Sequence, residues 1–420
     1  MIPEDWKSTT VLEIASRVRN AIVGGPFGSD LVSNDYVEEG VPVIRGQNVG
    51  FRIVSGSFAF VTPAKANSLE SNLAHPGDLV FTQRGTLGQV SLVPDQPFDR
   101  YLVSQSQMKL TVNRKVADPL FFYYVFSSSE QQEFIRQNTI QTGVPHTNLG
   151  ILRAIPVQRP SLAEQEAIAE ALSDADALIE SLEQLIAKKR QIKQGAMQGL
   201  LTGKKRLPGF RGEWDVKRLG DLCNFSGGFT ASRDQLSSEG YCYLHYGDIH
   251  TSQKSFIDVR SEYLDIPKLD IPLKKVSSVS LLDDGDVVFV DASEDDEGTS
   301  KHVVVINPDG LPFISGLHTI VAKCKTNVLE HQYRRYCFHT TEVKAQFRFF
   351  AVGTKVSGIS KTNIARVTLP VPTVPEQTAI AAILSDMDAE ISALEAKLIK
   401  ARMIKQGMMQ ELLTGKVRLI

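Results

Sequence analysis

The sequence lacks the features that mark membrane and secreted proteins. No apolar run approaches the roughly 18 residues that a membrane-spanning helix needs. The first residues, Met1–Lys7, lack the basic and apolar regions of a signal peptide. We therefore expect a cytoplasmic protein that has no membrane partner.

Cysteine is scarce, and its spacing is not that of a metal site. The chain has four cysteines: Cys223, Cys242, Cys324 and Cys337. They form neither a CxxC pair nor a Cys/His ligand pattern, which argues against zinc. Because thiols of cytoplasmic proteins stay reduced, we predict four free, semi-buried thiols and no metal site.

Neither sign of charge dominates the chain. Its 46 basic and 48 acidic residues give a net charge of −2, so no strong overall field attracts nucleic acid or a membrane surface. Local basic runs remain, at 188–193 and 204–206, with copies at Lys400 and Arg402. Such runs suit either the C-terminal end of a helix or a contact with phosphates or an acidic partner.

The signatures of common enzymes are also missing. There is no GxxxxGK[ST] phosphate loop, no GxSxG turn and no HExxH helix. The Asn/Asp-Pro-Pro-aromatic motif and the glycine-rich cofactor turn of adenine methyltransferases are absent as well. The acidic run 294–297 is more typical of a solvated loop than of a metal site. We expect no catalytic, cofactor or metal site in this chain.

What the sequence does have is a long internal repeat. A shift of 212 positions places Glu164–Leu207 on Glu376–Leu419, with well over half of the residues identical. The two copies end in "IKQGAMQGLLTGKKRL" and "IKQGMMQELLTGKVRL". Identity at this level indicates a duplicated structural unit.

Each copy has the pattern of a long helix with a narrow apolar seam. Apolar residues recur at alternating gaps of four and three, as in a coiled coil. Ser161 after Pro160, and Thr373 before Pro375, mark helix starts. Each helix could run for about 40 residues, or roughly 55–60 Å. The predicted seam residues are Ile168, Leu172, Ile179, Leu182, Ile186, Ile380, Leu384, Ile391, Leu394 and Leu398.

A helix this long cannot bury such a seam by itself, so it needs a partner. The duplicate helix is the simplest partner, and each helix follows its own globular domain. We therefore predict an antiparallel coiled coil within the chain and an internal pseudo-two-fold repeat. The alternative is that each helix packs on its own domain.

The segments before the helices are related more faintly. Trp6 aligns with Trp214, and "GDLVF" at 77–81 aligns with "GDVVF" at 285–289. Short β-rich runs broken by Gly, Asn and Asp predict an α+β fold with two mixed domains of mainly antiparallel strands. We place these domains at 1–160 and 208–372, the helical segments at 161–207 and 373–420, and short helices at 11–14 and 219–222.

The loops of the two domains carry side chains that can read base edges. Arg can bond guanine, Gln or Asn can bond adenine, and a carboxylate can accept from cytosine. In the first domain the candidates are Arg45, Gln47, Asn48, Gln83, Arg84, Gln105, Gln107, Gln141, Thr142, Thr147 and Asn148. In the second they are His245, Tyr246, Asp248, Ser293, Glu294, Lys301, His318, Lys355, Lys361 and Asn363. The two domains should differ in base preference.

Two variable domains, each followed by "EQxAIAxxLSDxDAxI…IKQGxMQxLLTGKxRL", resemble the specificity subunit of a type I restriction–modification system. The "DASEDDEGTSK" loop at 291–301 resembles a recurrent form in the target-recognition domains of that family. The resemblance implies that each domain reads one half of a bipartite, asymmetric site on double-stranded DNA. It also implies that the paired helices set the spacer and dock two modification subunits.

The resemblance further implies a non-catalytic subunit of a restriction and DNA adenine methyltransferase complex. S-adenosylmethionine and ATP would then bind to the partner modification and restriction/translocase subunits. Three alternatives remain open: a coiled-coil scaffold without DNA sequence preference, a stand-alone modifying enzyme, and a specificity subunit of a system that only methylates.

Overall fold

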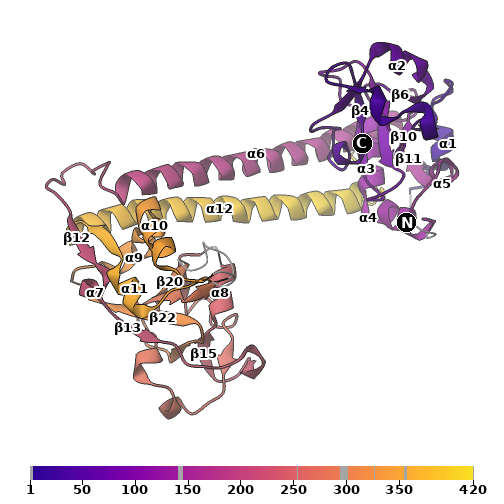
Figure 1. Ribbon diagram of the computed structural model, residues 1–420. Helices are drawn as coiled ribbons and strands as arrows, with labels where there is room; N and C mark the ends of the chain where they lie inside the picture. The colour runs from indigo at the N-terminus through magenta and orange to yellow at the C-terminus, as the bar shows by residue number, and fades with distance from the viewer. Residues whose placement is uncertain are drawn as a thin grey trace. The chain divides into compact units, whose positions relative to one another are not determined.

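The computed structural model describes residues 3–140, 145–252, 254–293, 301–325, 327–353 and 357–419. The chain forms two compact units, Met1–Glu183 with Ala396–Ile420, and Gln184–Glu395. Each unit contains one β-rich domain and part of both long helices (Figure 1). Among the described residues, no helix is both long and apolar enough to cross a membrane.

The described residues of the first domain form three sheets. The two-stranded sheet pairs β1 (Lys7–Thr10) with β11 (Pro156–Arg159). The four-stranded sheet has the order β2 (Ile22–Gly24), β10 (Gln107–Leu110), β7 (Leu79–Thr82) and β8 (Val90–Leu92). The five-stranded sheet has the order β3 (Tyr36–Val37), β5 (Ala59–Val61), β4 (Val41–Ile44), β9 (Tyr101–Val103) and β6 (Leu73–Ala74). The short helices are α1 (Val11–Ile14), α2 (Pro63–Ser68), α3 (Pro119–Ser127), α4 (Ser129–Gln137) and α5 (Leu149–Ala154).

The domain of the second unit repeats this plan. A two-stranded sheet pairs β12 (Asp215–Arg218) with β24 (Thr368–Val371). A five-stranded sheet has the order β13 (Cys223–Gly227), β22 (Thr319–Cys324), β18 (Val287–Val290), β20 (His302–Ile306) and β16 (Phe256–Asp258). A four-stranded sheet has the order β14 (Leu236–Ser237), β17 (Lys268–Leu269), β15 (Tyr241–Leu244) and β21 (Phe313–Ser315), and β19 (Ala292–Ser293) pairs with β23 (Ser357–Gly358). The helices are α7 (Leu219–Leu222), α8 (Tyr246–Thr251), α9 (His331–Cys337), α10 (Thr341–Phe350) and α11 (Lys361–Arg366).

The strand orders confirm the α+β fold and its internal repeat. The order β2-β10-β7-β8 corresponds to β13-β22-β18-β20, and β3-β5-β4-β9 corresponds to β14-β17-β15-β21. Among the described strands, all pairs are antiparallel except β4 with β9, β15 with β21, and β16 with β20. The short helices α1 and α7 have the predicted bounds.

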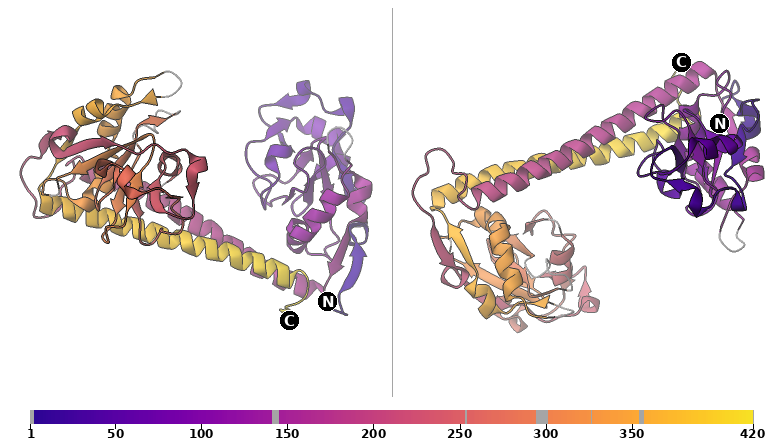
Figure 2. Two further views of the ribbon diagram at one scale, coloured as in Figure 1. Left: turned by 90° about the horizontal axis from the view of Figure 1, so that it is seen from below. Right: turned by 45° about the horizontal axis from the view of Figure 1, so that its top comes forward.

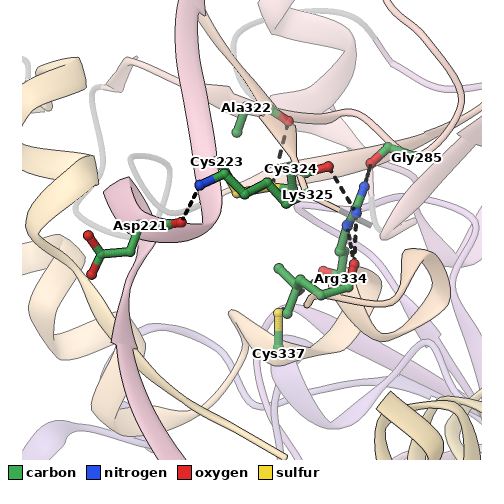
Figure 3. Close-up of a disulfide and its surroundings, with 9 residues drawn as sticks. Asp221, Cys223, Gly285, Ala322, Cys324, Lys325, Arg334 and Cys337 are labelled. Atoms are coloured by element: carbon green, nitrogen blue, oxygen red, sulfur yellow. Dashed lines mark hydrogen bonds between the residues drawn. A yellow bond between two sulfur atoms is a disulfide. The ribbon is translucent and has the colours of Figure 1, made fainter. Parts of the chain in front are cut away.

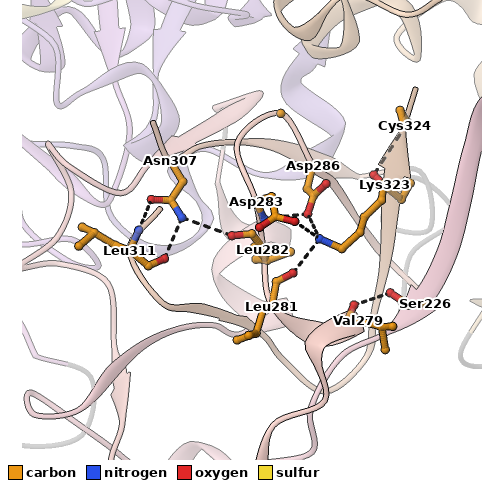
Figure 4. Close-up of polar contacts among 12 residues, drawn as sticks. Ser226, Val279, Leu281, Leu282, Asp283, Asp286, Asn307, Leu311, Lys323 and Cys324 are labelled. Atoms are coloured by element: carbon orange, nitrogen blue, oxygen red, sulfur yellow. Dashed lines mark hydrogen bonds and ion pairs between the residues drawn. The ribbon is translucent and has the colours of Figure 1, made fainter. Parts of the chain in front are cut away.

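The repeated "GDLVF" and "GDVVF" segments each place an aspartate beside a lysine of the neighbouring strand. Asp286 lies 2.7 Å from the Lys323 ammonium, which also contacts Asp283 (Figure 4). In the first domain Asp78 lies 3.5 Å from Lys109, and both side chains are buried. Burial raises the pKa of Asp286, so its partner lysine compensates a carboxylate that is costly to enclose.

The two long helices are α6 (Leu162–Leu200) and α12 (Val374–Leu412), each 39 residues long. At 1.5 Å per residue each measures about 58 Å. The Ser161 hydroxyl accepts from the Glu164 amide at 3.2 Å and caps α6 as predicted. Gly203 and Gly415 follow the last turns with a φ of +71°, which is the usual glycine ending of a helix.

Ion pairs show that the helices run antiparallel, as predicted. In the first unit Glu183 of α6 pairs with Arg402 of α12, and Asp176 pairs with Lys405, both at 2.5 Å. In the second unit the pairs are Lys189–Glu390, Arg190–Glu395 and Lys193–Asp388. From Asp176 to Glu183 the partner falls from Lys405 to Arg402, and from Lys189 to Lys193 it falls from Glu390 to Asp388. The two ribbons run side by side within each unit (Figure 2).

Each helix begins in the core of one domain and ends in the core of the other. Ile168 and Leu172 of α6 belong to the first core, and Leu200 belongs to the second. Likewise α12 begins with Leu384 in the second core and ends with Leu412 in the first. Packing of a helix on its own domain therefore accounts only for its first turns. Further along, the seam residues Leu182, Ile186 and Ile391 are buried, and Ile179, Leu394 and Leu398 are half-buried.

The repeated motif pairs with itself crosswise. Glu376, which opens the second copy, is buried and accepts from Arg206 of the first copy at 2.7 and 2.9 Å and from the Trp214 indole at 3.1 Å. Glu164, which opens the first copy, accepts in the same way from Arg418 and from the indole of Trp6. The opening glutamate of each copy is thus neutralised by the final arginine of the other copy.

The prediction of four free thiols is wrong for two cysteines. Cys223 of β13 and Cys324 of β22 form a disulfide (Figure 3). They face each other in the antiparallel register with Cα atoms 3.9 Å apart, a proximity that residues 101 positions apart in sequence do not reveal. Cys242 and Cys337 are free and buried, and burial raises the pKa of the Cys242 thiol.

Candidate nucleic-acid interface

Three loops of the first domain are tied into one surface by backbone hydrogen bonds. The Gln83 amide after β7 donates to the Ser106 carbonyl at 2.8 Å. The Thr147 amide donates to the Gln83 carbonyl at 3.0 Å, and the Ser104 amide donates to Ile44 at the end of β4 at 3.0 Å. Loops far apart in the sequence therefore meet at the ends of β4, β7 and β9. We call the residues joined by these bonds, Ile44, Gln83, Ser104, Ser106 and Thr147, the frame of the domain.

The second domain has the same hydrogen-bonded frame. The Asp291 amide donates to the His318 carbonyl at 3.1 Å, and the Ile359 amide donates to the Asp291 carbonyl at 2.8 Å. The Gly316 amide donates to Leu244 at 2.9 Å. The frame thus matches position to position, with Arg45 against His245, Gln83 against Asp291, and Ser106 against His318. Equivalent backbone positions carry chemically different side chains.

In each frame, one glycine lies too close to a neighbouring backbone carbonyl to carry a side chain. A Cβ atom on Gly25 would lie 2.0 Å from the Ser104 carbonyl oxygen, and one on Gly228 would lie 1.8 Å from that of Gly316. No side chain fits at such a separation, so the backbone itself would have to move.

Alanine at either glycine should destabilise its domain. We expect Gly25→Ala and Gly228→Ala each to lower the free energy of unfolding by about 2–3 kcal/mol, measured by thermal melting. The matched control is Gly195→Ala in α6, where nothing lies within 4 Å of the added Cβ. That control should gain about 0.5–1 kcal/mol from better helix propensity. Equal melting temperatures for all three variants would contradict the close approach.

The structure sorts the first-domain candidates by exposure. Gln47, Arg84 and Gln105 are exposed, and Arg45, Gln83 and Asn148 are half-buried. Asn48, Gln107 and Thr147 are buried. Gln141 and Thr142 lie outside the described residues. Arg84 and Gln105 lie in the bonded loops, because the Arg84 amide donates to the Ser106 carbonyl at 3.3 Å and Gln105 lies between Ser104 and Ser106. Gln47 follows β4, and its side-chain amide donates to the Ser57 carbonyl at 2.9 Å.

The buried candidates make hydrogen bonds within the loops and are not part of the exposed surface. The Asn48 amide donates to the carbonyls of Ser55 and Ser57 at 2.9 and 3.0 Å, and its oxygen accepts from the Arg45 amide. The Gln107 side chain bonds the Ser104 hydroxyl. These side chains are enclosed and make hydrogen bonds within the loops of the domain. Sequence alone could not separate them from their exposed neighbours because amides suit both roles.

The second-domain candidates divide in the same way. His318 and Lys361 are exposed, and Tyr246, Asp248, Lys301 and Asn363 are half-buried. His245 and Ser293 are buried, and Ser293 bonds His250 at 2.8 Å. The Lys301 ammonium donates to the His250 carbonyl and the Asn363 amide donates to Phe350, so both hold loops. Glu294 and Lys355 lie outside the described residues.

Aromatic rings and one carboxylate lie next to each other in this cluster. Tyr246 lies between His245, at 4.6 Å between ring centroids, and His318, at 5.4 Å. Burial lowers the pKa of His245, which favours a neutral ring whose Nδ1 accepts from the Gly247 amide. Asp248 accepts from Arg233 at 3.0 Å. Across the described residues, no group of three or more His, Cys, Asp or Glu side chains could hold a metal ion.

Two residues of the second cluster escaped the sequence interpretation. Arg233 and Asp291 were not among the candidate base readers, although Asp291 opens the 291–301 segment. Asp291 had a usable signal, because it follows "GDVVF" at the same distance as the candidate Gln83 follows "GDLVF". Arg233 had none, since only the fold brings its 3-10 turn to α8.

Both domains match the same protein family. The family model for the type I restriction modification DNA specificity domain matches residues 30–191 and again 211–401. The chain belongs to this family. The loop frame of each domain lies inside one of the two matched ranges, so each frame is part of a DNA specificity domain. This favours DNA recognition over the scaffold interpretation.

Relatives of this specificity family agree with the assignment. The specificity subunit of the type I restriction enzyme MjaVIII from Methanocaldococcus jannaschii is 25% identical over 334 residues, covering 76% of this chain and 74% of that protein. The S subunit of the type I system of M. genitalium has the same fold, with a TM-score of 0.58 at 16% identity over 98% of this chain and 96% of that one. A chain solved in work on complex assembly and conformational transition of the type I R-M system has a TM-score of 0.55 at 16% identity, over 99% and 100% of the two chains.

Proposed function

We propose that this chain is the DNA-recognition subunit of a type I restriction–modification complex, in which each specificity domain reads one half of a bipartite, asymmetric site. The observation that carries the proposal is the shared backbone frame with unlike side chains. A common frame would dock both domains on DNA in one manner, and different side chains would select different bases.

The exposed frame residues are the proposed base-reading groups. In the first domain these are Arg84, Gln47 and Gln105, which suit guanine and adenine edges in the major groove. In the second domain they are the exposed His318 and Lys361, and we add the half-buried Tyr246 and the carboxylate of Asp248 as an acceptor. The second surface would therefore favour a different half-site from the first.

The chemistry of the complex would belong to its partners. Two modification subunits would bind S-adenosylmethionine and methylate adenine, and restriction/translocase subunits would use ATP. This chain would supply the address, bind double-stranded DNA in the cytoplasm and contribute no catalytic group. Support comes from the relative named as a type I specificity subunit. We propose that the two domains span 1–160 and 208–372, and that the two helical segments span 161–207 and 373–420.

The long helices are the proposed ruler. A pair of 39-residue helices joined by ion pairs resists bending far better than a flexible linker, so it can hold a separation constant. Two readers on one duplex need such constancy, because each must meet its half-site in register with the DNA turn. The outer surfaces of the helices would also dock the modification subunits.

Arg84→Ala tests base reading in the first domain. We expect specificity at one base pair of the first half-site to fall by about 1–3 kcal/mol, while the second half-site keeps its preference. The measurement is methylome sequencing of cells that express the variant with its modification subunits. The matched control is Arg136→Ala, which removes an exposed arginine paired within α4 and should change no base preference.

Two outcomes would contradict this assignment. A uniform loss of affinity for all sequences, with a shallower salt dependence, would make Arg84 a phosphate contact. If random DNA competed as well as the target site for the complex in a gel shift, the chain would show no sequence preference. That result would support the scaffold interpretation.

A further inference from the structure

His318 adopts a backbone conformation that the fold does not demand. Its φ is +59°, and Asn20 is the one other non-glycine residue with positive φ among those described. The equivalent residue of the first frame, Ser106, makes the same carbonyl bond without positive φ. Backbone strain that the shared frame does not require tends to mark a functional position.

Hydrogen bonds on both sides of His318 fix the turn that carries it. The Leu317 amide donates at 2.9 Å to the hydroxyl of Tyr243, which is completely buried. The hydroxyls of Ser315 and Thr319 bond each other at 2.7 Å across the turn. Because these contacts fix the backbone on both sides, the His318 ring projects from a rigid base.

Two neighbours orient the ring. Its Nδ1 lies 3.3 Å from a carboxylate oxygen of Asp291, and the Tyr246 ring packs nearly perpendicular to it with 5.4 Å between ring centroids. Asp291 is itself held on the frame by its amide and carbonyl. A carboxylate oxygen accepts, so Nδ1 carries the hydrogen, and in the neutral form of this ring Nε2 is the acceptor. The side chain remains 49% exposed.

We infer that His318 is a specificity-determining residue of the second half-site, where its Nε2 accepts from an exocyclic amino group. In the major groove such groups are N4 of cytosine and N6 of adenine. Asp291 is then a positioning residue that sets the tautomer. The inference rests on the proposed function and adds to it the atom and the class of base edge.

His318→Gly separates a reading role from a structural one. Glycine suits a φ of +59°, so the variant should melt no lower than the parent chain. We expect preference for the amino-bearing base at one position of the second half-site to fall by about 5- to 100-fold. Methylome sequencing of the complex with its modification subunits would measure it. Asp291→Ala should weaken preference at that same position, and no other.

Asn20→Gly is the matched control, because Asn20 has a φ of +61° and makes none of the backbone hydrogen bonds of either frame. It should keep stability and both half-sites. If His318→Gly left the second half-site unchanged while the parent complex showed a bipartite preference, the inference would be wrong and the proposed function would stand. If the parent complex showed no bipartite preference, the proposed function itself would fail.

Discussion

Four residues inserted into both long helices, after Ile186 in α6 and after Leu398 in α12, should lengthen the spacer of the recognised site by one or two base pairs. Four residues add about 6 Å and a net turn of about 40°. One base pair adds about 3.4 Å, and 10–10.5 pairs make one turn, so distance and rotation change together. Both half-sites should stay as they are, because no frame residue moves within its domain.

Both residues of each interhelical ion pair described above lie on the same side of the insertion points, so the insertions separate none of these pairs. Glu183–Arg402 lies on one side of them and Arg190–Glu395 on the other. The control is the same insertion in α6 alone, which shifts one helix by four residues against its partner. That chain can align the pairs of one unit only, so it should melt lower and lose its site. A double insertion that altered half-site bases at constant spacer would refute the ruler.

Arg206→Ala should unfold the second unit far more easily. Glu376 has a side chain only 1% exposed, and Arg206 supplies the cation that faces it. Its removal leaves a buried carboxylate with the Trp214 indole as the remaining donor of this group. We expect the free energy of unfolding to fall by about 2–3 kcal/mol, somewhat less than for a fully enclosed pair because Arg206 is partly exposed.

The chain offers its own reporter for this measurement. It has two tryptophans, so a Trp6→Phe background leaves Trp214 beside the altered pair as the fluorescent probe of urea unfolding. Adding Glu376→Gln to Arg206→Ala should recover part of the loss, because a neutral amide needs no counter-charge. Arg190→Ala, which breaks the exposed pair with Glu395, should cost about 0.5 kcal/mol or less. Equal effects of Arg206→Ala and Arg190→Ala would show that burial of Glu376 does not matter.

The parts of the fold that could be predicted are those with local or repeated signals. Alternating gaps of four and three located α6 and α12, since helix periodicity is a property of neighbouring residues. Duplication indicated two like domains, and the shared short helices α1 and α7 followed from aligned tryptophans. For the candidate site, Arg84, Gln105 and His318 are exposed in loops, and their role in base reading stays a prediction.

The parts that could not be predicted depend on which distant segments meet. Asn48 and Gln107 have the composition of base readers, yet the fold encloses them. Cys223 and Cys324 look like unrelated thiols until β13 and β22 align them. Arg233 reaches Asp248 only because its turn lies beside α8. Burial and pairing at long range are set by packing, and no local pattern reports them.

By itself, the sequence determined two like domains, two long helices and a pair of matching motifs, because duplication and periodicity are written residue by residue. Tertiary structure alone decided that the motifs neutralise each other crosswise, through Glu164 with Arg418 and Glu376 with Arg206. It also decided which loop side chains face outward and that His318 stands on a strained, braced turn. These outcomes follow from the free energy of burying charge and apolar surface between segments far apart in the chain.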